Sequence, residues 1–166
     1  EHSVERSLRI ARYKSGKYTI ERPLHLGAVI ARPTATEHSE LLNVLSAYGL
    51  PLGEAFQLRD DMLGIFGDPE TTGKPAGDDL REGKRTVLMA MTMEKATDAA
   101  RAELSTNLGK PDLSPEKIES LRALIIDTGA VADVEKLIDR LGEESVDAAN
   151  SAAINEKARP FLLALA

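Results

Sequence analysis

Residues 55–86 join a segment with helical spacing to a glycine-rich loop, and both parts are crowded with charge. Seven carboxylates and five cations fall within these 32 residues. Gln57, Asp60 and Asp61 are spaced i, i+3 and i+4, so a helix places them on one face. The neighbouring positions are mostly apolar: Phe56, Met62, Leu63, Ile65 and Phe66. The pattern predicts a helix whose acidic stripe lines a mostly apolar wall.

The adjacent carboxylates Asp60 and Asp61 require a positive partner. In a partly dry cleft they repel each other unless a cation or a proton intervenes. Magnesium prefers oxygen ligands and keeps several waters, so one or two carboxylates and phosphate oxygens suffice to bind it. A lone acidic pair is usually a solvated helix face. Gln57 one turn earlier and the lysines that follow favour a site for Mg²⁺ with a diphosphate instead.

The loop that follows is rich in glycine and carries Lys74 and Lys84. A nucleotide-binding P-loop needs four residues between its glycines and Ser or Thr directly after its lysine. Five residues intervene in both Gly67–Gly73 and Gly77–Gly83, and neither lysine is followed by Ser or Thr. A P-loop is therefore excluded. The loop is expected to bring its lysines over whatever the acidic helix binds, and the alternative is an ordinary surface loop.

These motifs resemble the second aspartate-rich region of the trans-isoprenyl diphosphate synthases, which are also called polyprenyl synthetases. The resemblance rests on FQLRDDMLG at 56–64, GDP at 67–69, and GK, GDDL and GKRT within 73–86. Upstream, YKSGKY at 13–18 is similar to that family's lysine–threonine break, which lies in a kinked helix and binds diphosphate. The match covers about residues 4–105, and the motif sequences are most similar to those of bacterial geranylgeranyl or short-chain enzymes.

The resemblance implies an activity and a set of site residues. The reaction is ionisation of an allylic prenyl diphosphate, attack by the double bond of isopentenyl diphosphate, and loss of a proton. Asp60 and Asp61 would hold Mg²⁺, and the groups acting on the leaving diphosphate would be Asp60, Lys14 and Lys74. Further substrate contacts would come from Ser15, Gln57, Lys84, Asp79 and Phe56.

Two departures from the family pattern matter. The second motif is often DDxxD, and its last position here is Gly64. The family's first aspartate-rich motif should lie well before Lys14, and no residues here can hold it. The chain is therefore expected to be the C-terminal portion, over 1–166, of a single isoprenoid synthase domain. Its second aspartate-rich region occupies 56–86, and the missing N-terminal half becomes an expected partner, together with a second copy in a homodimer.

Composition agrees with an all-α helical bundle of the isoprenoid synthase type. Aromatic residues make up only 4% of the chain, and alanine and leucine dominate. Zero cysteines exclude disulfides and thiolate metal sites, and the net charge of −6 argues against nucleic acid. No stretch approaches the roughly 18 consecutive apolar residues of a membrane span. A cytoplasmic protein is expected.

Helices are expected throughout. A first helix over 3–14 should break at Ser15–Gly16 and resume over 19–30. Thr36 should cap a helix over 37–48, and Gly49–Pro51 should bend the chain into the acidic helix. Later helices are expected over 86–104, from Ser114 to Gly129, over 131–141, and over 145–165 with a break near Pro160.

Two other functions stay open. A terpene cyclase of the same fold also ionises prenyl diphosphates, although that group typically carries an Asn/Ser/Glu metal motif. A non-catalytic helical partner subunit could retain the same motifs without activity. Product chain length and the preferred allylic substrate do not follow from the sequence, because the family sets them largely near its first motif.

Overall fold

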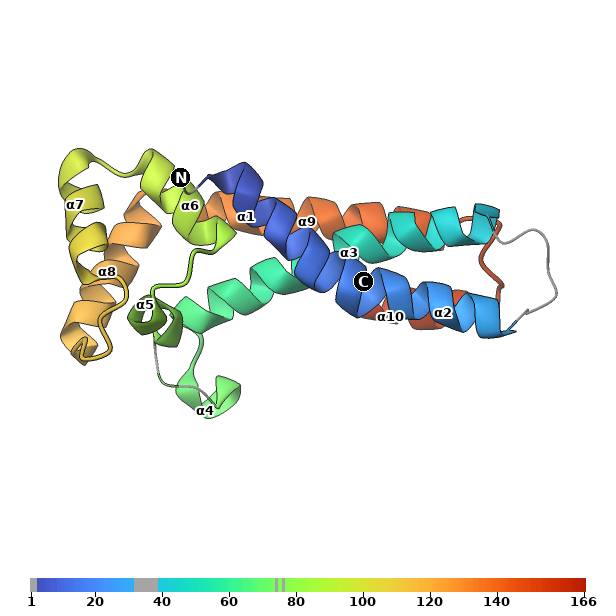
Figure 1. Cartoon of the computed structure of the whole chain (residues 1–166), viewed down its shortest axis with the longest axis horizontal. Coiled ribbons are helices and arrows are strands. Elements are labelled where there is room, and N and C mark those ends of the chain that lie inside the picture. The colour runs from blue at the N-terminus through green and yellow to red at the C-terminus, as the bar shows by residue number, and fades with distance from the viewer. Residues whose placement is uncertain (1–2, 32–38, 74, 76) are drawn as a thin grey trace. The chain divides into compact units, whose positions relative to one another are not determined.

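The computed structural model describes residues 3–31, 39–73, 75 and 77–166, and every regular element in these ranges is helical (Figure 1). The predicted all-α class is thereby confirmed. The elements, in chain order, are α1 Val4–Ala11, the π-helix η1 Arg12–Glu21, α2 Arg22–Ala31, α3 Ser39–Phe66, α4 Pro69–Thr72, α5 Asp78–Glu82, α6 Val87–Lys95, α7 Asp98–Asn107, α8 Pro115–Asp127, α9 Ala130–Ala149 and α10 Arg159–Leu165.

The chain forms two compact units. The first unit contains the residues up to Leu8 together with Leu58–Lys136, and the second contains Arg9–Gln57 together with Leu137–Ala166. Helices α3 and α9 each contribute residues to both units. The expectation of a single domain stays a prediction.

The break predicted at Ser15–Gly16 is wrong, because the helix continues through these residues. α1, η1 and α2 follow one another without interruption, and η1 has the wide turns of a π-helix. Short π-helical segments inside α-helices occur frequently at functional sites. Ser15 and Gly16 are buried in this segment. At the motif YKSGKY, residues 13–18, the helix therefore changes from α-helical to π-helical turns and does not end.

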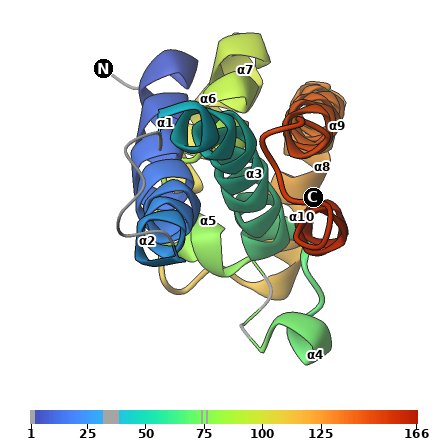
Figure 2. The same ribbon diagram turned by 90° about the vertical axis from the view of Figure 1, so that its right-hand side faces the viewer.

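The two helices predicted on either side of Gly49–Pro51 form one helix, because α3 runs unbroken from Ser39 to Phe66 with Pro51 inside it. The glycines have another use. A Cβ atom on Gly53 would lie 2.5 Å from the Cα of Gly16, and one on Gly49 would lie 3.2 Å from the Cα of Glu21. Glycine on α3 thus permits the backbone of η1 to approach closely. In the same unit, α2 and α10 flank α3 (Figure 2).

N-cap side chains divide the chain of the first unit into short helices. Thr86 Oγ1 accepts from the Met89 N–H group at 3.1 Å, and Thr97 Oγ1 accepts from the Ala100 N–H group at 3.3 Å. The predicted helix over 86–104 is therefore two helices, α6 and α7, since Thr97 starts a new one. Ser114 caps α8 as predicted.

The last helices also differ from the expectation. α9 extends to Ala149 and is longer than predicted, and its buried positions continue through Leu141, Ser145 and Ala149. Residues 150–158 are not helical, and α10 starts only at Arg159 with Pro160 in its first turn, where proline is tolerated. The predicted cap Thr36 lies outside the described residues.

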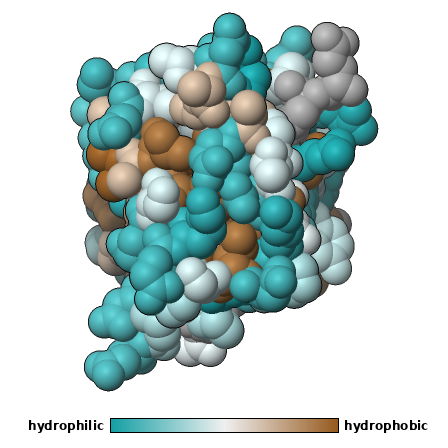
Figure 3. Space-filling view, turned by 90° about the vertical axis from the view of Figure 1, so that its left-hand side faces the viewer, coloured by the Kyte–Doolittle hydropathy of each residue, from teal (hydrophilic) through white to brown (hydrophobic). Residues whose placement is uncertain are grey.

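Exposed apolar side chains are unevenly distributed between the units. The end of the first unit around α7 and α8 has a largely hydrophilic surface with separate apolar patches (Figure 3). In the second unit, large exposed apolar residues are frequent on α2 and α10, among them Leu26, Ile30, Phe161 and Leu165. None of the described helices combines the length and the apolar composition needed to cross a membrane.

Because η1 and α3 are in close contact, adding one methyl group at position 53 should change the stability of the protein. Gly53→Ala should lower the free energy of unfolding by about 1–3 kcal/mol, the usual cost of overpacking, because the new Cβ meets the Gly16 backbone. Gly27→Ala in α2 is the control, since a Cβ there has nothing within 4 Å. The control should be neutral or stabilising by up to about 1 kcal/mol. Urea denaturation measures both, and equal effects would contradict the close contact.

Candidate active site

Helix α3 contains the predicted acidic pair. Gln57, Asp60 and Asp61 all lie within it, so the predicted helix is confirmed. Asp60 is exposed, whereas Asp61 is buried, with 9% of its surface accessible. The carboxylate of Asp60 is therefore the one of the pair that faces solvent. Asp61 has a partner within the protein.

Ser15 and Gln57 are brought into direct contact. The Ser15 hydroxyl donates a hydrogen bond to Gln57 Oε1 at 2.7 Å, and both side chains are buried. The bond occupies the oxygen of the Gln57 side-chain amide, so its NH₂ group points away from Ser15. The two residues that the sequence assigned to one substrate site therefore meet at the crossing of η1 and α3.

A second polar contact, which was not predicted from the sequence, accompanies the first. Arg12 Nη1 donates to Glu54 Oε1 at 2.8 Å. Arg12 precedes Ser15 by three residues, and Glu54 precedes Gln57 by three, so the two contacts repeat with the same spacing on each helix. Burial raises the pKa of the Glu54 carboxyl, and the Arg12 guanidinium opposes that rise. The opposite charges of Arg12 and Glu54, and their equal spacing from Ser15 and Gln57, were the features of the sequence that could have indicated this contact.

Lys14 faces away from this contact. Its side chain is exposed, while the next residue, Ser15, is buried. The Lys14 carbonyl accepts from Thr19 Oγ1 at 3.3 Å, five residues further along η1. Beside it, the Lys17 ammonium lies 5.1 Å from the centroid of the Tyr13 ring, a cation–π arrangement. Lys74, the other lysine predicted to act on the diphosphate, lies outside the described residues.

Lys84 is held by carboxylates of its own loop. Its ammonium donates to Asp79 Oδ1 and lies 3.1 Å from Glu82 Oε2. The hydrogen bond to Asp79 is the main cause of a pKa for Lys84 well above its ordinary value. The Asp79 carboxylate is buried, with 4% of its residue accessible. The structure therefore brings together Asp79 and Lys84, and it adds Glu82, which was not among the predicted site residues.

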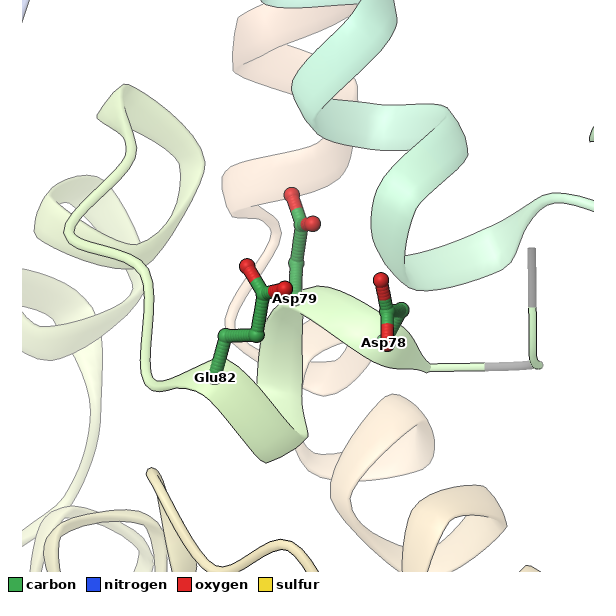
Figure 4. A group of neighbouring side chains, drawn as sticks. All are labelled: Asp78, Asp79 and Glu82. Atoms are coloured by element: carbon green, nitrogen blue, oxygen red, sulfur yellow. The ribbon is translucent and has the colours of Figure 1, made fainter.

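These acidic residues form a compact group on α5. One carboxylate oxygen from each of Asp78, Asp79 and Glu82 lies within 4.8 Å of the others, so the group could accommodate a cation (Figure 4). The Lys84 ammonium already provides a positive charge there. Asp79 and Glu82 share a face of a helix through their i, i+3 spacing, which was the signal for Glu82.

Phe56 lines an apolar pocket in the second unit. Its side chain is 61% exposed, and the pocket has a volume of about 330 Å³. The other lining residues come from η1, α2, α3 and α10: Thr19, Ile20, Pro23, Leu24, Tyr48, Leu52 and Leu165. Tyr48 donates from its hydroxyl to the Leu162 carbonyl at 2.8 Å, which fixes α10 beside the pocket. Burial raises the pKa of Tyr48.

Comparisons with known proteins agree with these features. The sequence profile of the polyprenyl synthetase family matches residues 1–125. The chain is 38% identical over 124 residues to the geranylfarnesyl diphosphate synthase of Aeropyrum pernix, covering 75% of this chain and 36% of that protein. It is 37% identical over 100 residues to the geranylgeranyl diphosphate synthase of Saccharolobus solfataricus, covering 60% of this chain and 29% of that protein.

Solved structures share the fold. The geranylgeranyl pyrophosphate synthase of Corynebacterium glutamicum, crystallised with isoprenyl diphosphate and magnesium, is 44% identical with a TM-score of 0.91. That match covers 99% of this chain and 46% of the solved one. A polyprenyl synthetase from Streptomyces coelicolor is 27% identical with a TM-score of 0.85, over 98% of this chain and 48% of that one.

The chain spans about a third of the length of these curated relatives and about half of the solved chains. The all-α fold of the solved synthases, the acidic helix and the matched residues 1–125 identify the same family. This chain therefore belongs to the polyprenyl synthetase family.

Proposed function

We propose that this chain is the C-terminal part of a magnesium-dependent prenyltransferase. The complete enzyme would condense isopentenyl diphosphate with an allylic prenyl diphosphate to give a longer isoprenyl diphosphate. The observation that carries the proposal is the Ser15–Gln57 contact on a helix that continues, one turn later, into Asp60 and Asp61. Family membership supports it, and so does the relative crystallised with isoprenyl diphosphate and magnesium.

The difficult step of this reaction is the separation of a diphosphate anion from an allylic carbocation. The residues fit a magnesium ion, because Mg²⁺ prefers oxygen ligands and α3 carries the exposed Asp60 carboxylate with Asp61 next to it. When bound, the metal would neutralise charge that develops on the departing diphosphate. Lys14 and Lys74 would add fixed positive charge, which stabilises the transition state when it is already in place.

Ser15 and Gln57 would orient the substrate. The Ser15 hydroxyl donates to the amide oxygen, and this bond fixes the orientation of the Gln57 side chain one turn before the acidic pair. Asp79 would hold Lys84 in place, with Glu82 as the second partner of the ammonium. In this role Lys84 would contribute charge to the substrate site from a position set by its own carboxylates.

The prenyl tail requires a dry environment, because water would quench the carbocation. The pocket beside Phe56 supplies an apolar wall, and Phe56 precedes Asp60 by one turn of α3. Its volume of about 330 Å³ falls at the lower end of the range of small-molecule sites, about 300–1,000 Å³. We assign Phe56 and this pocket to the hydrocarbon part of the substrate.

The proposal includes partners. The relatives are about twice as long as this chain, and an N-terminal part of the enzyme would carry the opposing aspartate-rich motif. The exposed apolar residues of α2 and α10 suit packing against such a segment. A homodimer and a cytoplasmic location complete the proposal. A terpene cyclase would yield a cyclic hydrocarbon or alcohol from the same diphosphates, and a non-catalytic subunit would yield no product.

The first test concerns the acidic pair in the complete enzyme. Asp60→Asn should lower the rate of prenyl transfer by about 10²–10³, the usual cost of removing a group that stabilises transition-state charge. Asp61→Asn should have a smaller effect, because Asp61 is buried and has a partner in the protein. Asp139→Asn, on the exposed face of α9, is the control and should leave the rate unchanged. Near-normal turnover in Asp60→Asn would remove it from the site.

The second test concerns the lysines. Lys14→Ala and Lys74→Ala should each slow the chemical step, measured as a single-turnover rate with saturating substrates. Arginine at either position should restore it only partly, because a planar guanidinium places its charge differently from a compact ammonium. Lys136→Ala, an exposed lysine of α9, serves as the control. An unchanged single-turnover rate would assign that lysine to the solvated surface.

The third test concerns the isolated 166-residue chain. It should self-associate, because the apolar side chains of α2 and α10 are exposed, and it should lack prenyl transferase activity. Size-exclusion chromatography and an assay with labelled isopentenyl diphosphate measure the two properties. Robust magnesium-dependent product from a monodisperse preparation would contradict the need for an opposing half.

A further inference from the structure

Gly64 on α3 leaves a space that the Asp79 carboxylate fills. A Cβ atom built on Gly64 would overlap Asp79 Oδ2 and the carboxyl carbon, and it would lie 2.7 Å from Asp79 Oδ1. Real Cβ atoms essentially never come within 3.0 Å of such neighbours. Asp79 could not keep this position if residue 64 carried any side chain. Both residues belong to the first unit, so the contact lies within one compact body.

The two oxygens of Asp79 have different neighbours. Oδ2 is the atom nearest to the position of a Gly64 Cβ, whereas Oδ1 accepts the hydrogen bond from Lys84. The carboxylate therefore lies between α3 and the Lys84 ammonium. The Asp79 carbonyl also accepts from the Lys84 N–H group at 3.0 Å, which ties the backbone of the two residues together.

The place where Asp79 meets α3 matters for the acidic pair. Residue 64 follows Asp60 by four positions and Asp61 by three, so it shares their face of the helix. Position 64 is also where the aspartate-rich motif of this chain has lost its last carboxylate. A carboxylate is still present at this point of the surface of α3, but it comes from α5.

We propose that Gly64 is a positioning residue, whose missing side chain seats the Asp79 carboxylate against the acidic face of α3 and thereby fixes the Lys84 ammonium. Any side chain at position 64 displaces Asp79, and Lys84 then loses its buried partner. The seating itself is independent of the activity. Its catalytic consequence, a displaced positive charge beside the diphosphate, rests on the proposed function.

The test is the acylation rate of Lys84 by an amine-selective reagent, measured by mass spectrometry on the folded 166-residue chain. Gly64→Ala should raise this rate by about three- to tenfold, because an ammonium that loses a carboxylate partner deprotonates more readily. Asp79→Ala should raise it to a similar extent. Gly27→Ala, a helical glycine with nothing near its Cβ position, is the control and should leave the rate unchanged.

The double variant isolates the contact. In an Asp79→Ala background the space beside residue 64 is empty, so adding Gly64→Ala should no longer raise the acylation rate or lower the urea midpoint. If Gly64→Ala alone fails to fold, the double variant should fold and so support the proposal. An unchanged Lys84 acylation rate in Gly64→Ala overturns it, and so does equal destabilisation with and without the Asp79 side chain.

The same variants separate this proposal from the function. Lys84 acylation needs no substrate, so it reports on the seating even if prenyl transfer is absent. If acylation changes as expected but the complete enzyme shows no prenyl transfer, the proposed function fails and the positioning stands. If Gly64→Ala slows prenyl transfer while Lys84 acylation stays unchanged, the positioning fails and the function stands.

Discussion

The contact between two glycine backbones organises the predicted substrate residues of the second unit. Gly16 of η1 and Gly53 of α3 approach so closely that a Cβ atom on Gly53 would lie 2.5 Å from the Cα of Gly16. This approach brings Ser15 within hydrogen-bond distance of Gln57, and Arg12 within the same reach of Glu54. Short side chains such as serine can bridge two helices only when the backbones are this close. The Ser15–Gln57 contact is thus a consequence of packing.

In the first unit, a polar group packed against α3 is stabilised by an opposite charge. Asp79 is buried, and a buried carboxylate is costly unless it is paired. Lys84 supplies the pairing charge, and Glu82 supports it. In both units a glycine on α3 makes room for a polar group from another element: Gly53 for the Ser15 region and Gly64 for Asp79. The contacts of α3 with other elements therefore depend on its glycines at positions 53 and 64 as well as on its side chains.

Much of this was predictable from local rules. The acidic helix follows from i, i+3, i+4 spacing, and the start of α8 follows from serine before proline. The all-α class follows from composition. Where a single residue type has one dominant local effect, as with the N-cap Ser114, the sequence was a reliable guide.

The failures have a common physical origin. Gly49 and Pro51 were interpreted as the boundary between two helices, because both weaken an isolated helix, but α3 continues through them and packs closely against η1. The partner of Arg12 depends on which helices cross, and that information is absent from a short window. Thr97 was the exception, since its capping role was visible locally and was overlooked within a longer apolar pattern.

The wide turns of η1 make this part of the chain sensitive to its exact number of residues. Consecutive residues of an α-helix are rotated by about 100° around its axis. Loss of one residue between Gly16 and Glu21 would shift the register of every preceding side chain by one position relative to α2. Lys14 would then move toward the buried place of Ser15, opposite Gln57. A length change of a single residue, without any substitution, would place an ammonium where a hydroxyl now lies.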